Sequence, residues 1–157
     1  MCAFVRAAIA LVRPYGTRVL VNDRLDVALA SGADGVHLRV NSLPVAEVRR
    51  CVAADFLVAA STHSLAEAQA AERAGADFIV CGPVYETPSK RAYGAPLGIP
   101  AFAEVCRTVN VPVFALGGIK LDNFRTTLAN GAAGIAAIGL FTQPDKIVAT
   151  VRALLTA

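Results

Sequence analysis

The sequence predicts an α/β fold whose parallel sheet is part of a (β/α) barrel. Short, continuous apolar runs alternate with Ala-rich stretches of helical periodicity along the 157 residues. Such runs are typical of parallel strands covered by helices, and their alternation with helices predicts right-handed βαβ units. None of the expected strands is followed by the GxGxxG turn of a dinucleotide-binding sheet, which favours a barrel over an open sheet.

Each expected element has its own run of residues, and the length suits one domain over residues 1–157. The strands are expected at Val19–Asn22, Gly35–Leu38, Phe56–Ala60, Asp77–Gly82, Pro112–Leu116 and Gly134–Ile138. The helices are expected at Met1–Arg13, 24–31, 43–53, 65–75, 100–109, 121–130 and 145–156. Ser64 and Glu67 form a capping-box pattern at the start of one of these helices.

One phrase recurs where a helix ends and the next strand begins. It reads Gly32-Ala33-Asp34, then Gly75-Ala76-Asp77, then Gly131-Ala132-Ala133. A repeated corner indicates similar units added around a ring. A complete barrel of this type has eight strands and usually about 250 residues, so the six strands predict an incomplete barrel.

Composition excludes several classes of function. The formal net charge is +3 and the basic residues are scattered, which predicts no binding to nucleic acid. No apolar run approaches the roughly 20 residues of a membrane span, so we expect no membrane contact. The apolar start lacks a basic leader and is interrupted by arginines, which favours an amphipathic helix over a signal peptide. Four widely spaced cysteines predict a reduced, cytoplasmic chain.

Polar residues follow the first two strands, at the edge where parallel α/β folds bind ligands. Asp23, after Asn22, is placed either to hold Mg²⁺ or to cap the next helix. His37 is either a hydrogen-bonded core residue or a ligand-binding group. Arg39 is expected at the mouth of the sheet, to meet an anion or to be solvated. Ser42 is expected to cap the following helix.

Two later segments contain groups that suit phosphate. His63, at the end of a strand, is expected either to bind phosphate or move protons, or to fill a turn. The loop Pro83–Gly98 is long for a compact domain, which is typical of functional loops. Its hydroxyls and cations lie within five positions: Thr87, Ser89, Lys90 and Arg91. This set suits a pyrophosphate, because cations neutralise its charge and hydroxyls orient its oxygens.

Glycines mark a further candidate phosphate site near the last two strands. Gly117 and Gly118 follow a strand and precede a helix, which allows close approach of backbone N–H groups to a phosphate. A plain tight turn is the alternative. Gly139 offers a comparable approach after the last strand, matching the phosphate site of many barrels.

Together these phrases resemble the thiamine phosphate synthase/TenI family. The matching stretches are Val21–Leu29, Gly32–Leu38, Ser61–Ser64, Gly75–Asp77, Gly82–Lys90, Pro96–Gly98 and Ala115–Ile119. The resemblance implies a TIM-type barrel, matched here from its third strand onward without the first two. It also implies thiamine biosynthesis: the synthase joins a hydroxymethylpyrimidine pyrophosphate to a thiazole phosphate and releases pyrophosphate, with Mg²⁺ as cofactor.

The resemblance implies roles for particular residues. Asn22 and Asp23 match a pair that handles pyrophosphate and Mg²⁺, and Ser61 matches a serine near the pyrimidine. We expect catalytic roles for Asn22, Asp23, Ser61 and Lys90, with Asp23 as the metal ligand. We expect substrate or phosphate binding by Thr87, Ser89, Lys90, Gly117, Gly118, Gly139, His37 and His63.

Four departures from the family pattern keep alternatives open. Ser42 stands where the synthase typically has a second Mg²⁺-binding aspartate, Arg39–Val40 replaces a Gly-Gln segment, and Gly139 replaces a serine. Pro83 stands where active TenI-type thiazole tautomerases have a histidine. The alternatives to the synthase are therefore a tautomerase, using His63 or another base, and a catalytically silent binder of thiazole phosphate or thiamine phosphate.

The expected sheet has two unpaired edges, at Val19–Asn22 and Gly134–Ile138. Each would present free N–H and C=O groups beside apolar side chains. The sequence therefore predicts a homo-oligomer that covers the open side of the barrel, with a two-fold dimer as the favoured form.

Overall fold

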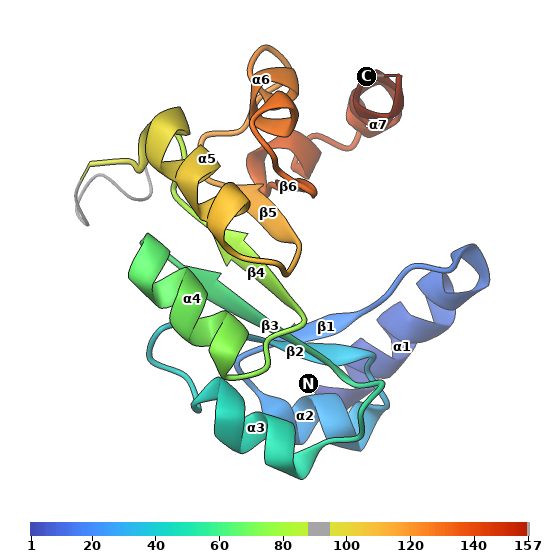
Figure 1. Cartoon of the computed structure of the whole chain (residues 1–157). Helices are drawn as coiled ribbons and strands as arrows, with labels where there is room; N and C mark the ends of the chain where they lie inside the picture. Colours follow the sequence, from blue (N-terminus) through green and yellow to red (C-terminus); the bar gives the residue numbers. More distant parts are fainter. Residues whose placement is uncertain (88–94, 157) are drawn as a thin grey trace.

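The computed structural model describes residues 1–87 and 95–156. Within these ranges, six parallel strands pair in the order of the chain, β1-β2-β3-β4-β5-β6. They are β1 (Leu20–Asn22), β2 (Gly35–Leu38), β3 (Leu57–Thr62), β4 (Phe78–Cys81), β5 (Val113–Leu116) and β6 (Gly134–Ala136). The sheet curls into a half-barrel (Figure 1), which confirms the expected fold class.

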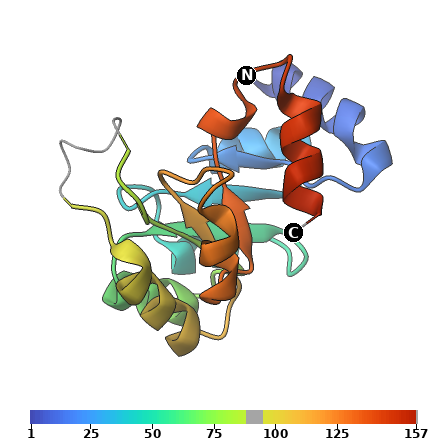
Figure 2. The ribbon, with the colours of Figure 1, turned by 90° about the horizontal axis from the view of Figure 1, so that it is seen from above.

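All the expected helices are present, with ends shifted by a few residues. They are α1 (Cys2–Val12), α2 (Leu25–Ser31), α3 (Val45–Cys51), α4 (Leu65–Arg73), α5 (Gly98–Thr108), α6 (Phe124–Ala129) and α7 (Ile147–Leu155). Helices α2 to α6 each pack on a strand next to them in sequence, and α1 packs on α2. Figure 2 shows the same ribbon from above, with α1 in blue and α7 in red. None of the described helices has the length and apolar character needed to cross a bilayer.

The apolar core lies between the sheet and its helices. Val36, Val58 and Ile79 are completely buried on this outer face. The other face of the strands is the concave side of the curl, and its side chains are mostly half-exposed. Phe78 and Phe114 stack edge to face there, with ring centroids 5.3 Å apart. Two aromatic rings therefore form part of the concave face, and the polar groups of this face lie nearer the carboxyl ends of the strands.

One element boundary differs from expectation in a way that affects the site. Strand β3 continues to Thr62, so Ser61 is a strand residue rather than part of the turn that follows. Helix α4 begins as predicted: the Glu67 N–H donates to Ser64 Oγ at 3.2 Å. The Glu67 carboxylate accepts the N–H of His63 at 2.7 Å, which completes the cap.

The repeated helix-to-strand corner ties neighbouring strands together at their amino ends. The Asp34 N–H donates to the Val19 carbonyl at 2.9 Å, and the Asp34 carboxylate accepts the Val19 N–H at 2.8 Å. Asp77 makes the same two bonds to Val58, at 2.8 and 2.6 Å. The third corner, residues 131–133, repeats the backbone bond with alanine in place of aspartate.

Candidate functional site

Asp23 lies at the carboxyl end of β1 in an unusual backbone conformation. Its φ is +67°, in the left-handed region that residues other than glycine seldom adopt. Its N–H donates to the His37 carbonyl of β2 at 2.8 Å, which holds the residue against the sheet. The alternative that Asp23 caps α2 is wrong, because the N-cap is Arg24 and no side chain caps this helix. The strained backbone instead directs the carboxylate across the mouth of the sheet.

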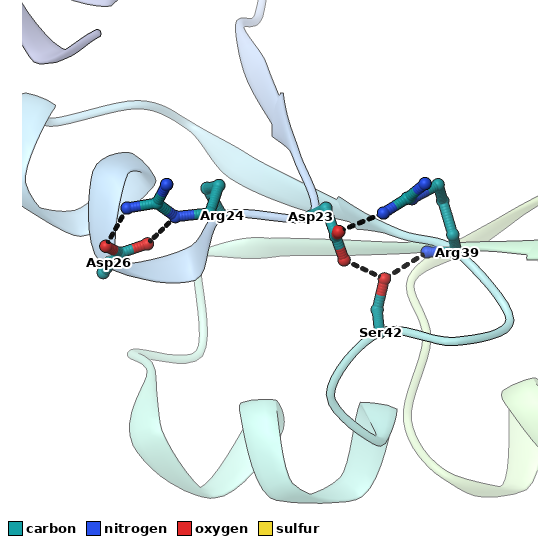
Figure 3. Close-up of polar contacts among 5 residues, drawn as sticks. All are labelled: Asp23, Arg24, Asp26, Arg39 and Ser42. Carbon is teal, nitrogen blue, oxygen red and sulfur yellow. Dashed lines mark hydrogen bonds and ion pairs between the residues drawn. The ribbon is translucent and has the colours of Figure 1, made fainter.

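The Asp23 carboxylate holds two groups from the segment after β2 (Figure 3). Arg39 Nη2 donates to one carboxylate oxygen, and Ser42 Oγ donates to the other. The Ser42 hydroxyl in turn accepts the backbone N–H of Arg39 at 2.8 Å. The expectation that Ser42 caps α3 is wrong, because its side chain is used here and Pro44 is the N-cap.

These contacts stabilise the ionised form of Asp23. The hydrogen bond from Ser42, followed by that from Arg39, lowers the pKa of the Asp23 carboxyl below its usual value. The carboxylate is therefore ionised at neutral pH. In a neighbouring pair, the Arg24 guanidinium donates two hydrogen bonds of 2.8 and 2.6 Å to the Asp26 carboxylate.

Neutral polar groups line the concave face next to this pair. Asn22 and His37 are register partners on β1 and β2. His37 Nε2 and Ser61 Oγ are 2.9 Å apart, which links β2 to β3. Burial lowers the pKa of His37, so its imidazole is neutral at pH 7 and adds no positive charge. The fold thus brings together Asn22, Asp23, His37 and Ser61.

His63 is not part of this cluster. Its side chain is exposed, and its backbone N–H serves the start of α4 through Glu67. The structural interpretation of this residue, as part of a helix-opening turn, is the one its contacts favour.

The Gly117–Gly118 turn follows β5 and lies against the start of the long loop. Both glycines have positive φ, +95° and +66°. A Cβ on Gly117 would lie 2.6 Å from Pro83 Cα, and one on Gly118 would lie 2.7 Å from the Glu86 carbonyl oxygen. Glycine is therefore required at both positions by close backbone approach, before any ligand is considered.

Asn123 fixes this turn, and the sequence reasoning did not single it out. Its side-chain amide donates to the Gly118 carbonyl at 2.9 Å and its Oδ1 accepts the Lys120 N–H at 2.8 Å. An asparagine shortly after a Gly-Gly pair, at the start of a helix, was the available signal.

The other residues expected to bind phosphate are Thr87, Ser89, Lys90 and Gly139, and they do not all lie at the glycine turn. Thr87 is half-buried and directly follows the segment packed on the glycine turn. Ser89 and Lys90 lie outside the described residues. Gly139 begins a short 3-10 helix, Gly139–Phe141, and is exposed with no atom within 4 Å of a Cβ added there. The backbone of Gly139 is therefore surrounded by open space, and its approach to a phosphate stays a prediction.

The sequence model of one protein family, thiamine monophosphate synthase, matches residues 1–141. The chain belongs to the thiamine monophosphate synthase family. A putative thiamine-phosphate synthase of Geobacter sulfurreducens is 49% identical over 141 residues, which cover 89% of this chain and 66% of that protein. A thiamine-phosphate synthase of Roseiflexus sp. is 41% identical over 151 residues, covering 96% and 64%. The chain thus spans slightly less than two thirds of these relatives.

One solved structure agrees with the family assignment, and a second shares the fold. The thiamine phosphate pyrophosphorylase of Pyrococcus furiosus superposes with a TM-score of 0.88 at 33% identity, covering 99% of this chain and 74% of that one. A structure titled native KDPGal superposes with a TM-score of 0.72 at 15% identity, a likeness of fold alone.

The described residues of this thiamine monophosphate synthase family member do not fit the magnesium site expected at Asp23. Both carboxylate oxygens already accept hydrogen bonds, one of them from a guanidinium cation. Ser42 contributes a neutral hydroxyl, and residues 1–87 and 95–156 contain no cluster of three or more His, Cys, Asp or Glu that would hold a metal. Magnesium usually takes one or two carboxylates together with phosphate oxygens and water.

Proposed function

We propose that the chain acts in thiamine biosynthesis by the thiamine-phosphate synthase reaction. In this reaction the bond between the pyrimidine methylene carbon and the pyrophosphate oxygen breaks, and pyrophosphate leaves. The thiazole nitrogen then forms a bond to that carbon. One observation supports the proposal most strongly: the carboxyl edge of the parallel sheet has two separate candidate anion-binding sites. One follows β1 and β2, and the other follows β5.

The first place is proposed for the pyrophosphate and the pyrimidine. Asn22, Asp23 and Ser61 lie at the carboxyl end of the strands, beside the neutral imidazole of His37. A neutral histidine and a serine hydroxyl suit the ring of a pyrimidine, which presents hydrogen-bond donors and acceptors but no full negative charge.

The second place is proposed for the thiazole phosphate. Gly117 and Gly118 expose backbone without side chains, and Asn123 holds the turn in one conformation. Thr87, Ser89 and Lys90 are proposed to complete the phosphate shell from the long loop. A lysine there would supply the compact charge that a phosphate needs.

A catalytically silent binder of thiazole phosphate is the second candidate. It is favoured by the fact that the glycine turn is fixed by Asn123 independently of the β1–β2 mouth. The tautomerase has no comparable support, because Pro83 stands where that activity needs a histidine and His63 is exposed at a helix start.

Pyrophosphate release from a mixture of both substrates tests the proposal. We expect release that depends on both substrates and that falls in Lys90→Ala, whose lost charged hydrogen bonds correspond to about 1.5–3 kcal/mol of binding. An Arg24→Gln variant is the control. Binding of thiazole phosphate without any release would contradict the synthase and support the silent binder, and isomerisation of the thiazole alone would support the tautomerase.

We also propose that the chain is a cytoplasmic single domain that forms a two-fold dimer. The exposed apolar side chains of α7, which include Val148, Val151 and Leu155, suit burial against a partner. Sedimentation at low micromolar concentration tests this proposal, and a stable monomer would contradict it.

A further inference from the structure

Arg39 places its positive charge directly beside the Asp23 carboxylate. Its guanidinium contacts one oxygen of the carboxylate, and Ser42 contacts the other. Two backbone attachments fix this arrangement: the Asp23 N–H to the His37 carbonyl at 2.8 Å, and the Arg39 N–H to Ser42 Oγ at 2.8 Å. The cation is therefore supplied by the chain itself.

The guanidinium remains available to a ligand while it holds Asp23. The Arg39 side chain is 60% exposed and that of Asp23 is 28% exposed. Of the five N–H donors of a guanidinium, Nη2 provides the one bonded to Asp23. The planar fork of the remaining donors matches two oxygens of a phosphate group.

A divalent ion at Asp23 would compete with this guanidinium. The ion would have to displace Arg39 from the carboxylate and then remain next to a fixed positive charge. Ser42 cannot offset that repulsion, because a hydroxyl adds no negative charge. His37 is neutral through burial, so among the described residues of this cluster Arg39 carries the positive charge. Arg24, a second cation among the described residues nearby, donates two hydrogen bonds to the Asp26 carboxylate.

We propose that the Asp23–Arg39–Ser42 cluster binds the diphosphate group directly through Arg39, without a magnesium ion on Asp23. This inference rests on the proposed function, which supplies the diphosphate ligand. Asp23 and Ser42 are positioning residues that orient the guanidinium, and Arg39 is the residue that contacts the anion.

Calorimetric titration with inorganic pyrophosphate tests this inference, once in excess Mg²⁺ and once in a metal chelator. We expect the same affinity in both conditions for the parent chain. Arg39→Gln should weaken binding at least about tenfold, the size of one charged hydrogen bond. Arg24→Gln, which removes a neighbouring but engaged cation, should stay within about twofold. Binding by the parent only with Mg²⁺, or equal binding by Arg39→Gln, would overturn the proposal.

A metal-binding measurement provides a second, independent readout. Electron paramagnetic resonance with Mn²⁺ alone should show no ion held by the parent chain, whereas Arg39→Gln combined with Ser42→Asp should hold one. Mn²⁺ bound by the parent would contradict the proposal. If Arg39→Gln does not fold, Arg39→Lys replaces it: the point charge without the fork should still weaken pyrophosphate binding.

These outcomes are separate from those of the synthase assay. Metal-free pyrophosphate binding without turnover would leave this inference standing and contradict the synthase. Turnover together with strictly Mg²⁺-dependent pyrophosphate binding would support the synthase and contradict this inference.

Discussion

Aspartate–arginine pairs occur at both edges of the sheet, and they are attached to the fold differently. At the amino edge, Asp77 pairs with Arg49 and also accepts the Val58 N–H of the neighbouring strand at 2.6 Å. At the carboxyl edge, Asp23 pairs with Arg39, and its other partner is a loop hydroxyl. The first carboxylate joins strand to strand, whereas the second joins only segments that follow strands.

This difference shows that the group bonded to the carboxylate besides the arginine determines whether an ion pair stabilises the fold. Arg49 also donates to the carbonyls of Gly75, at 3.1 Å, and Phe56, at 2.9 Å, so its pair with Asp77 closes a corner of the fold. Removing such a carboxylate leaves a strand N–H without its acceptor, which costs more than an exposed ion pair gains. The groups around Asp23, by contrast, would return to water. The amino edge therefore maintains the fold, whereas the carboxyl edge leaves the Arg39 guanidinium largely exposed.

The largest effect is expected at the Gly117–Gly118 turn, where the carboxyl edge also contributes to stability. Gly118→Ala places a methyl group 2.7 Å from the Glu86 carbonyl oxygen at a positive φ. We expect a loss of about 3 kcal/mol in the free energy of unfolding, measured by urea denaturation. Gly139→Ala, with no atom within 4 Å, is the control and should change little. Equal losses in the two variants would contradict this assignment.

Asp77→Asn tests the amino edge directly. An amide accepts the Val58 N–H more weakly and loses the ionic bond to Arg49. We expect a loss of about 2 kcal/mol in unfolding free energy with unchanged affinity for pyrophosphate. Glu47→Gln, which breaks an exposed pair with Arg50, should lose about 0.5 kcal/mol or less. A stable Asp77→Asn variant with weakened ligand binding would reverse the roles of the two edges.

Asp34 gives the amino edge a pH dependence. The Val19 N–H, and secondarily Arg18, lowers the pKa of the Asp34 carboxyl below its usual 3.8. A carboxyl with a lowered folded pKa contributes stability above about pH 4, and this contribution is lost as pH falls through the folded pKa. Asp34→Asn should therefore cost about 1 kcal/mol at neutral pH and progressively less below about pH 4. Urea denaturation across this range checks it; a pH-independent difference would contradict the mechanism.

The third helix-to-strand corner, which has alanine in place of aspartate, allows a gain in stability to be tested. The Ala133 N–H donates to the Val113 carbonyl at 2.8 Å, as Asp34 and Asp77 do to their partners. Ala133→Asp should add the missing bond to the Val113 N–H and stabilise the fold by about 1 kcal/mol, seen as a higher melting temperature. Ala133→Asn is the control with a neutral acceptor. Destabilisation by both would show that the three corners are not equivalent.

The smallest effect on stability is expected for Asp23→Asn. Its side chain is partly exposed, and its partners Arg39 and Ser42 lie in segments outside the strands. We expect an unchanged melting temperature and weaker binding of pyrophosphate, because the guanidinium is no longer held in place. A large drop in melting temperature would place Asp23 with the amino-edge carboxylates.

The sequence predicted the strands well because each is a continuous apolar run, and the Asn22–Asp23 and Gly117–Gly118 positions followed from where those runs end. It misplaced Ser42 as a helix cap, since its hydroxyl bonds to a carboxylate 19 residues earlier. That contact depends on the pairing of β1 with β2, which local patterns do not encode. The end of β3 was placed too early for the same reason: Ser61 and Thr62 continue as strand because β4 pairs with them.

We propose a division of roles in which ligands bind at the carboxyl edge while the amino edge maintains the fold. A titration with thiamine phosphate, followed by amide chemical shifts in two-dimensional ¹H–¹⁵N NMR, tests it residue by residue. We expect the largest shifts at residues 22–23, 37–42 and 117–118. We expect the amide chemical shifts of Val19, Val58 and Asp77 to remain unchanged. Shifts concentrated at those amino-edge amides, or no saturable shift at all, would contradict it.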